Sequence, residues 1–299
     1  MILVVGATGF LGSEICRHLI VKHKSVTGLI RSSSDPERVA ALRQSGVQLV
    51  GGDLKDRLSL DRACAGASIV ISTATSARSR QPADSIEATD ARGQINLVEA
   101  ARAAGVTRFI YISYSGQIGV DDPLTRAKRA VEQALKTSGI EYTILRPSYF
   151  MEFWFSPMIG FDHANAKVTI YGTGLNKISW VSLSDIAEFA AACVDNPASS
   201  NAVIELGGPQ ALSPLEVVRI FEQASRKSFE VSHVPEDALR AQEAAATDSL
   251  QKAFAALMLS YAKGDAIPMQ ETLKRYHMNF RSVPEYVHTL ANCEAIPQS

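Results

Sequence analysis

The sequence predicts an α/β fold with a doubly wound parallel sheet and a smaller, interleaved C-terminal lobe. Three observations lead to this prediction. The chain opens on a short apolar run, Ile2–Val5, which is typical of a strand buried on both faces. A glycine-rich turn and a helical pattern follow that run directly. Strand and helix patterns then alternate at least five times, which favours a parallel sheet with helices on both faces.

Composition limits the classes of function. A chain of 299 residues that is 46% hydrophobic can bury a large core, in one large or two intimate domains. The net charge is −1 with acids and bases interspersed, so we expect no nucleic-acid partner. No apolar run has membrane-spanning length, and the first strand leaves no room for a signal peptide. The cysteines have no metal-ligand or redox spacing: Cys16, Cys64, Cys193 and Cys293. We expect a cytoplasmic monomer or homodimer that holds no metal and acts on a small molecule.

The turn after the first strand carries three glycines at regular spacing in the sequence GATGFLG. Glycine permits a sharp turn, close approach of backbone N–H groups to phosphates, and close packing of helix on strand. The N-terminus of the helix that follows adds partial positive charge. We therefore predict a dinucleotide pyrophosphate site; the alternative is a tight strand–helix connection without a ligand. The residues expected to contact the cofactor are Gly6, Thr8, Gly9, Phe10, Leu11 and Gly12.

The second strand, expected over Ser25–Ile30, ends at Arg31 and a run of serines. In a dinucleotide fold the end of this strand faces the adenosine ribose, where a carboxylate would favour NAD. A guanidinium beside hydroxyl groups suits a 2′-phosphate instead. We expect Arg31 and Ser32 to bind NADP(H), with NAD(H) as the second possibility. The alternative is a solvated arginine in a serine-rich loop.

The next two strands supply further cofactor candidates. Asp35 and Pro36 begin a helix, and the third strand is expected over Val47–Val50. Asp53 follows with Leu54; its carboxylate could accept from the adenine amine, cap the next helix, or do both. The fourth strand is expected over Ser68–Ala74. The residues predicted near the pyrophosphate and nicotinamide ribose are Thr73, Ala74 and Thr75.

A polar loop, Ser76 to Pro82, is expected to lead into one long helix that ends at Gly105. Asn96 is the interior polar residue of this helix, and it either ties down a neighbouring loop or lies at the surface. The fifth strand is expected over Val106–Ser113, so that Ser113 lies at its carboxyl end.

Asp122 and Pro123 begin the next helix, expected over Leu124–Ser138, which places a lysine on its apolar face. At 100° per residue Lys128 lies among Leu124, Ala127 and Val131, whereas Arg129 points to the opposite side and is expected in solvent. Burial of an unpaired ammonium is costly, so an inward lysine needs a partner or a task. The alternative is a lysine at the edge of the face whose amine reaches water.

The sixth strand, Glu141–Leu145, is followed by residues expected to bind cofactor and line the substrate cleft: Pro147, Ser148 and Tyr149. An aromatic segment follows, then short strands over 168–171 and 178–181, a helix over 182–194 and a returning strand over 202–206. Further helices are expected after Ser213, over 235–262 and after Ser282. These patterns predict a nucleotide-binding domain over 1–150 and a substrate lobe over 151–299, with 178–208 returning to the first domain.

Several ordered motifs together resemble the NmrA-like group of atypical short-chain dehydrogenase/reductases. They are GATGFLG, the GDL that ends at Leu54, the inward Lys128, and SGIEYTILRPSYFME at Ser138–Glu152. The resemblance is good over the first two-thirds of the chain and looser beyond. It implies a Rossmann domain, a smaller substrate lobe and a preference for NADPH. Members of the group include quinone, azo-dye and phenylpropanoid reductases, and also regulators that bind the cofactor without turning it over.

The sequence departs from typical short-chain dehydrogenases at one position. Their Tyr-x-x-x-Lys motif supplies an acid/base tyrosine, but Leu124 stands four residues before Lys128. By resemblance to the phenylpropanoid reductases, Lys128 would bind the nicotinamide ribose or assist protonation. The catalytic candidates are Lys128, Ser113 and Tyr149, with Ser115 as an equal contender for the serine. We expect an NADPH-dependent reductase that transfers hydride to a quinone, enone or conjugated carbonyl. The alternatives are a non-catalytic NADP(H)-sensing regulator and, less favoured, a sugar-nucleotide epimerase that uses Tyr114 or Tyr149.

Overall fold

The computed structural model describes residues 1–77, 81, 83–118 and 121–294; residues 78–80 and 82 of the expected polar loop lie outside these ranges. The chain divides into two compact units. The first consists of Met1–Tyr114, Asp121–Arg146 and Ile186–Ile204, and the second of the described parts of 115–120, 147–185 and 205–299. The chain therefore leaves the first unit and re-enters it before the C-terminal segments.

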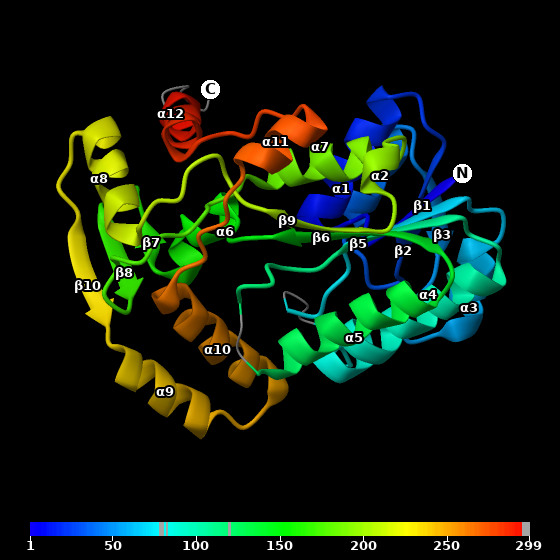
Figure 1. The fold of residues 1–299 in the computed structure, drawn as a ribbon, viewed down its shortest axis with the longest axis horizontal. Coiled ribbons are helices and arrows are strands. Elements are labelled where there is room, and N and C mark those ends of the chain that lie inside the picture. Colours follow the sequence, from blue (N-terminus) through cyan, green and yellow to red (C-terminus); the bar gives the residue numbers. More distant parts are fainter. Residues whose placement is uncertain (78–80, 82, 119–120, 295–299) are drawn as a thin grey trace. The chain divides into compact units, whose positions relative to one another are not determined.

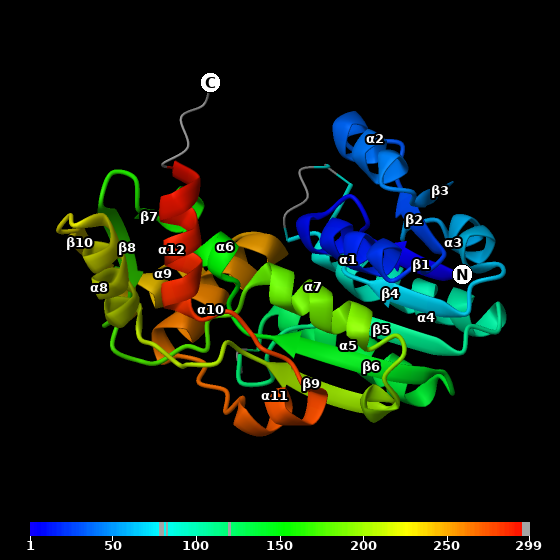
Figure 2. The same ribbon diagram turned by 90° about the horizontal axis from the view of Figure 1, so that it is seen from above.

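A seven-stranded sheet confirms the predicted doubly wound architecture. Its order is β3-β2-β1-β4-β5-β6-β9, which can be followed in Figure 2. The strands from β1 to β6 pair in parallel, with Val4 opposite both Gly28 and Ile71. The strands are β1 (Ile2–Val5), β2 (Val26–Ile30), β3 (Gln48–Gly51), β4 (Ile69–Ser72), β5 (Arg108–Ile112), β6 (Glu141–Pro147) and β9 (Ala202–Leu206). The strand order reverses at β1, and open sheets bind ligands at the carboxyl ends of the strands beside such a point.

Helices cover both faces of this sheet. Figure 1 shows α1 and α7 on one face and α3, α4 and α5 on the other. The interior includes Leu3, Phe109 and Leu135, all fully buried. The elements are α1 (Phe10–Val21), α2 (Pro36–Gln44), α3 (Arg57–Cys64), η1 (Ile86–Gly93), α4 (Gln94–Ala103), α5 (Pro123–Thr137), α7 (Leu183–Ala192) and η3 (Pro197–Ser199). As predicted, Asp35 caps α2 and Asp122 caps α5.

The helix expected to end at Gly105 differs from the prediction. Its first half, η1, is wound as a π-helix, and only α4 is an α-helix. Gly93 joins the two, and a Cβ at this residue would lie 2.8 Å from the Cβ of Leu54. The close approach of Leu54 therefore requires a glycine at the point where the winding changes.

The second unit contains a small mixed sheet with the strand order β10-β8-β7. Its strands are β7 (Phe161–Asp162), β8 (Lys167–Tyr171) and β10 (Glu230–Val234). Its helices are α6 (Met151–Trp154), η2 (Pro157–Ile159), α8 (Pro214–Ser225), α9 (Glu236–Ala245), α10 (Ser249–Lys263), α11 (Gln270–Tyr276) and α12 (Val283–Glu294). The helix expected after Ser213 is α8, which begins with a capping box of Ser213 and Glu216. Asp248 caps α10, so the helix expected over 235–262 is divided into α9 and α10.

The strand expected over 178–181 does not form. Ile178 makes isolated bridges to Leu212 and Asp265, and Val181 makes one to Phe150. Each end of the segment pairs with a different stretch of chain, so no continuous ladder develops. A Cβ at Gly208 would lie 1.9 Å from the carbonyl oxygen of Trp180, so this close backbone approach is open only to glycine.

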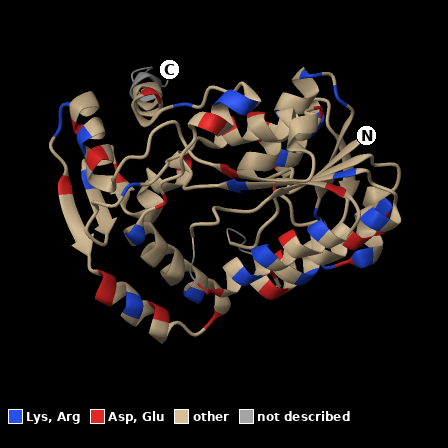
Figure 3. Ribbon diagram, viewed as in Figure 1, with Lys and Arg blue, Asp and Glu red and all other residues tan. Residues whose placement is uncertain are grey.

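No helix within the described part of the chain is long and apolar enough to cross a membrane. Figure 3 shows basic and acidic residues interspersed along the helices α3, α4 and α5.

Candidate active site

The glycine-rich turn brings three backbone segments into close contact. Gly6 has φ = +87°, and its carbonyl oxygen accepts from the N–H of Gly9 at 2.9 Å. A Cβ at Gly12 would lie 2.1 Å from the carbonyl oxygen of Gly6, and one at Gly6 would lie 2.5 Å from Oγ1 of Thr73. The turn therefore excludes side chains at Gly6 and Gly12, because the strand, the first turn of α1 and the end of β4 are packed together.

The N-terminus of α1 fits an anionic group. Its N-cap residue is Gly9, which has no side chain to bond the free N–H groups, and the first turn of α1 holds no acidic residue. The partial positive charge of the helix is therefore not offset by a carboxylate of its own. Arg38, which was not among the predicted site residues, contacts both Thr8 and Phe10. The Arg38 guanidinium lies 4.4 Å from the Phe10 ring centroid and donates to the Thr8 carbonyl oxygen at 3.0 Å. These residues fit a dinucleotide pyrophosphate.

The loop that leaves β4 is held by two buried polar residues. Gln94 accepts from the Ser72 hydroxyl at 2.9 Å and donates to the Ala74 carbonyl oxygen at 2.8 Å. Asp90 accepts from the backbone N–H and the hydroxyl of Ser76 at 2.9 and 2.5 Å. Gln94 and Asp90, rather than the Asn96 named from the sequence, are seen to hold this loop, and Asn96 is partly exposed on α4. The spacing of four residues between Asp90 and Gln94, which places both on one helical face, was the available signal.

Arg31, which is predicted to bind the cofactor, is paired rather than freely solvated. Its guanidinium donates to the Asp84 carboxylate at 2.6 Å, and Lys55 binds the other oxygen of the same carboxylate. Lys55 also lies 3.5 Å from Asp53. The hydrogen bond that Lys55 donates to Asp84 is the main cause of the raised pKa of Lys55. Ser32 is exposed beside this cluster. Asp84 and Lys55 were not among the predicted site residues.

The prediction that Asp53 caps the next helix is wrong. Asp56 caps α3 by accepting from the N–H of Leu58 at 3.1 Å. The Asp53 carboxylate accepts from the N–H of Lys55 at 2.9 Å, and the backbone N–H of Asp53 donates to Ser59 Oγ at 3.0 Å. Asp53 thus orders the turn before the helix, and its adenine role stays a prediction.

Lys128 faces inward, as its position on the apolar face of α5 predicts. Its side chain is buried, and Nζ donates to the carbonyl oxygen of Ile112 at 3.3 Å and lies 5.1 Å from the Tyr111 ring centroid. Burial lowers the pKa of Lys128, while the charges of Asp90 and Glu132 oppose that shift. The ammonium is therefore held at the carboxyl end of β5.

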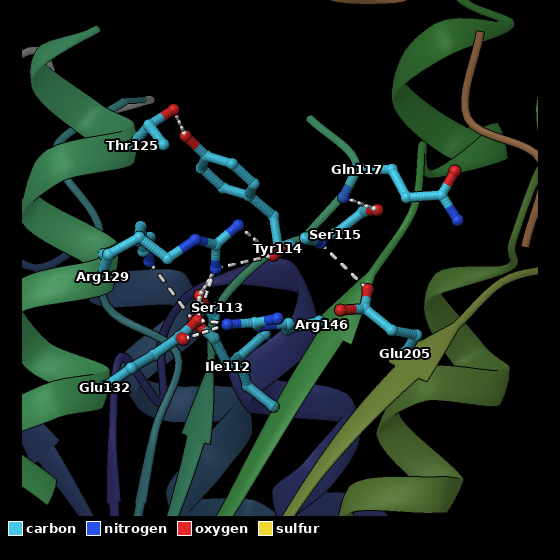
Figure 4. A network of polar contacts seen from close by, with 12 residues as sticks. Ile112, Ser113, Tyr114, Ser115, Gln117, Thr125, Arg129, Glu132, Arg146 and Glu205 are labelled. Carbon is cyan, nitrogen blue, oxygen red and sulfur yellow. Dashed lines mark hydrogen bonds and ion pairs between the residues drawn. The ribbon is translucent and has the colours of Figure 1, made fainter. Parts of the chain in front are cut away.

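One turn after Lys128 in α5, Glu132 accepts hydrogen bonds from three side chains (Figure 4). Ser113 donates its hydroxyl to Glu132 at 2.6 Å, Arg146 donates through Nε at 3.1 Å and through Nη2, and Arg129 donates through Nη1. Arg129 also donates to the Tyr114 carbonyl oxygen at 3.1 Å. Burial acts to raise the pKa of Glu132, but the donors and the two arginine charges hold it below its usual value. The expectation that Arg129 is in solvent is wrong, because Glu132 and the two residues that follow β5, Ser113 and Tyr114, provide partners for it.

The serines and tyrosine after β5 and β6 lie in the second unit. Ser115 and Ser148 donate to the two oxygens of the buried Asp265 carboxylate at 2.8 and 2.6 Å. Tyr149 is buried within an aromatic group, with ring centroids 4.8 Å from Trp154 and 6.0 Å from Tyr261. Asp265, far along the chain, was missed. The catalytic roles predicted for Ser113 and Tyr149 stay predictions.

The model of the NmrA-like family matches residues 1–287. The chain belongs to the NmrA-like family. This membership confirms the resemblance that the motifs indicated. The match extends well beyond the first two-thirds of the chain, where the motifs were clearest.

Related sequences differ in their described roles. Photosystem II assembly factor Ycf39 of Cyanophora paradoxa is 31% identical over 241 residues, which cover 78% of this chain and 71% of that protein. The isoflavone reductase homolog IRL of Zea mays is 31% identical over 255 residues, which cover 80% and 78%. Among solved structures, the NADPH-dependent quinone oxidoreductase of Escherichia coli complexed with NADPH superposes with a TM-score of 0.78. It is 23% identical, and the match covers 97% of this chain and 99% of that one; it shows the same fold.

Proposed function

We propose that this chain is an NADPH-dependent reductase that transfers hydride to an electron-poor small molecule, such as a quinone, enone or conjugated carbonyl compound. The observation that carries the proposal is the pairing of a glycine turn shaped for a pyrophosphate with an inward Lys128 at the end of β5. Gly6, Gly9 and Gly12 would hold the pyrophosphate, and Arg31 would hold the 2′-phosphate. When bound, NADPH supplies the hydride.

The residues around Lys128 favour acceptors that need no strong protein acid. Leu124 occupies the position of the tyrosine in the Tyr-x-x-x-Lys motif. The hydroxyl of Tyr114 is hydrogen-bonded to Oγ1 of Thr125. Burial raises the pKa of Tyr114, so this phenol is a poor acid/base for an epimerase. A reduced quinone delocalises its negative charge and can take a proton from water. Lys128 would stabilise the developing oxyanion or the nicotinamide ribose, and catalysis would depend mainly on alignment of two flat rings.

The relatives support the reductase class. The maize relative is a homolog of isoflavone reductase, and the Escherichia coli structure is an NADPH-dependent quinone oxidoreductase bound to NADPH. Transfer of these activities to this chain is part of the proposal.

A second candidate, an NADP(H)-sensing regulator, is favoured by two observations. The tyrosine is missing, and the hydroxyl proton of Ser113 is directed to Glu132 rather than outward. The relative Ycf39 is described as an assembly factor, a role other than reduction, which also supports this candidate.

One experiment separates the two candidates. The purified protein is incubated with NADPH and a panel of quinones, enones and conjugated carbonyl compounds, and loss of NADPH absorbance is followed. The reductase proposal predicts acceptor-dependent oxidation that a Lys128→Met variant loses. Tight NADPH binding without acceptor-dependent oxidation across the panel would reject the reductase and favour the sensor.

A further inference from the structure

Asp84 lies between two cations that the adenosine end of the site offers. One carboxylate oxygen accepts from Arg31 Nη1 at 2.6 Å, and the other accepts from Lys55 Nζ. The Asp84 side chain is 3% exposed, whereas that of Arg31 is 35% exposed. The carboxylate is therefore enclosed, and the guanidinium that holds it remains accessible to solvent.

The three residues come from different strand ends. Arg31 follows β2, Lys55 lies after β3, and Asp84 lies in the connection between β4 and η1. In the sheet β1 lies between β2 and β4, so the Arg31–Asp84 ion pair joins segments from both sides of β1. The glycine turn leaves the carboxyl end of that same strand. The adenosine half of a dinucleotide bound at the turn has to extend toward this ion pair.

Asp84 is fixed locally as well as by its cations. Its backbone N–H donates to the Gln81 carbonyl oxygen at 3.0 Å, and the next residue, Ser85, caps η1 by accepting from the N–H of Ala88 at 3.0 Å. The ion pair is thus a built feature of the connection between β4 and η1. Asp84 and a phosphate monoester are both oxyanions that bind a guanidinium in the same way.

We propose that Asp84 determines cofactor specificity by competing with the 2′-phosphate of NADP(H) for Arg31 and Lys55. The inference rests on the proposed cofactor site. A cofactor with a 2′-phosphate has to separate Asp84 from these cations or bind beside a like charge, whereas NADH leaves the ion pairs intact. Asp84 therefore lowers the preference for NADPH over NADH that Arg31 alone would give.

The test measures binding rather than turnover. Dissociation constants of NADPH, NADH and 2′,5′-ADP are determined by titration calorimetry for the wild type and Asp84→Asn. Asparagine keeps the size of the side chain and one acceptor oxygen but removes the charge. We expect NADPH and 2′,5′-ADP to bind about tenfold more tightly to the variant, which corresponds to about 1.4 kcal/mol, and NADH to change by less than about twofold. Asp84→Ser serves as a second neutral variant with the same expected result.

Two controls separate competition from other effects. Asp61→Asn removes the same charge from α3, where Asp61 pairs with Arg57, and should leave all three constants unchanged. In an Arg31→Ala background, Asp84→Asn should give a much smaller gain, because the cation contested is then missing. Unchanged or weaker NADPH and 2′,5′-ADP binding in both neutral variants overturns the inference and leaves the cofactor proposal standing. Failure of the wild type and every variant to bind NADPH overturns both.

Discussion

The two regions of the candidate site are built in opposite ways. At the end of β1, the glycine turn depends on the absence of side chains, since a Cβ at Gly12 would lie 2.1 Å from a backbone oxygen. At the end of β5, the site depends on charged side chains, with Arg129, Arg146 and Ser113 all bonded to Glu132. The first region is therefore sensitive to the addition of a methyl group, and the second to the removal of one charge.

The largest effect on stability is expected from Glu132→Ala. This change leaves the cations of Arg129 and Arg146 without their shared carboxylate, and loss of one partner of a buried ion pair costs about 3–5 kcal/mol. Urea denaturation measures the free energy of unfolding. Glu99→Ala is the matched control, because Glu99 pairs with Arg57 at the surface, and about 0–1 kcal/mol is expected there. If the two variants lost the same free energy of unfolding, the buried carboxylate of Glu132 would be no more important for stability than the surface carboxylate of Glu99.

Lys128→Met tests whether the charged region also serves the reaction. Methionine fills similar space without an ammonium, so stability should stay within about 1 kcal/mol or rise. Turnover with the best quinone should fall by about 10²–10⁴-fold if the amine stabilises developing charge. Steady-state kinetics and urea denaturation of the same preparation decide this. A large stability loss with unchanged turnover would make Lys128 a structural residue.

Gly12→Ala tests the region without side chains. The new methyl group clashes with the Gly6 carbonyl, so the turn has to open and the pyrophosphate site loses its shape. We expect NADPH and NADH affinity to fall together by about 100-fold, equivalent to about 2.7 kcal/mol. Gly51→Ala is the control, because among the described residues no atom other than those of its chain neighbours lies within 4 Å of a Cβ at Gly51. A preferential loss of one cofactor would argue against a pyrophosphate role.

Arg31→Ala should distinguish the cofactors instead of affecting both. Loss of a charged hydrogen bond to the 2′-phosphate should weaken the binding of NADPH by about 1–3 kcal/mol more than the binding of NADH. Fluorescence titration with each cofactor measures the difference. Equal weakening of both would assign Arg31 another role.

The smallest effect concerns pH. The pKa of Glu132 is lowered in the folded protein relative to its usual 4.5, so the unfolded chain binds a proton to this group first as the pH falls. The stability that Glu132 contributes is therefore complete above pH 4.5 and is lost as the pH falls through its folded pKa. Glu132→Gln should lack this part of the acid dependence in urea denaturation at pH 5, 4 and 3. If the stability of Glu132→Gln and that of the wild type fell in parallel with pH, Glu132 would not be the source of this acid dependence.

The same contrast separates the features of the site that the sequence predicts from those that it does not. The glycine turn, the caps Asp35 and Asp122, and the inward Lys128 are all consequences of local spacing, and each is found as predicted. The partners of charged groups are not local. Arg31 meets Asp84 across 53 positions and Ser148 meets Asp265 across 117, so only the assembled fold reveals them.

Helical periodicity also failed where partners came from another element. It assigned Arg129 to solvent because the residue lies away from the apolar face of α5. The carbonyl oxygen of Tyr114, at the end of β5, provides the partner that a helix considered alone lacks. Periodicity describes which side of a helix a residue occupies, but it does not describe which polar groups that side meets.

The placement of Glu132 has a consequence for how this protein can vary. One carboxylate balances two arginines from α5 and β6, and it lies one helical turn from Lys128. A substitution at position 132 would be tolerated mainly together with loss of a cation at 129 or 146. In a combinatorial library these three positions should change as a set, and libraries aimed at new acceptors should leave them intact.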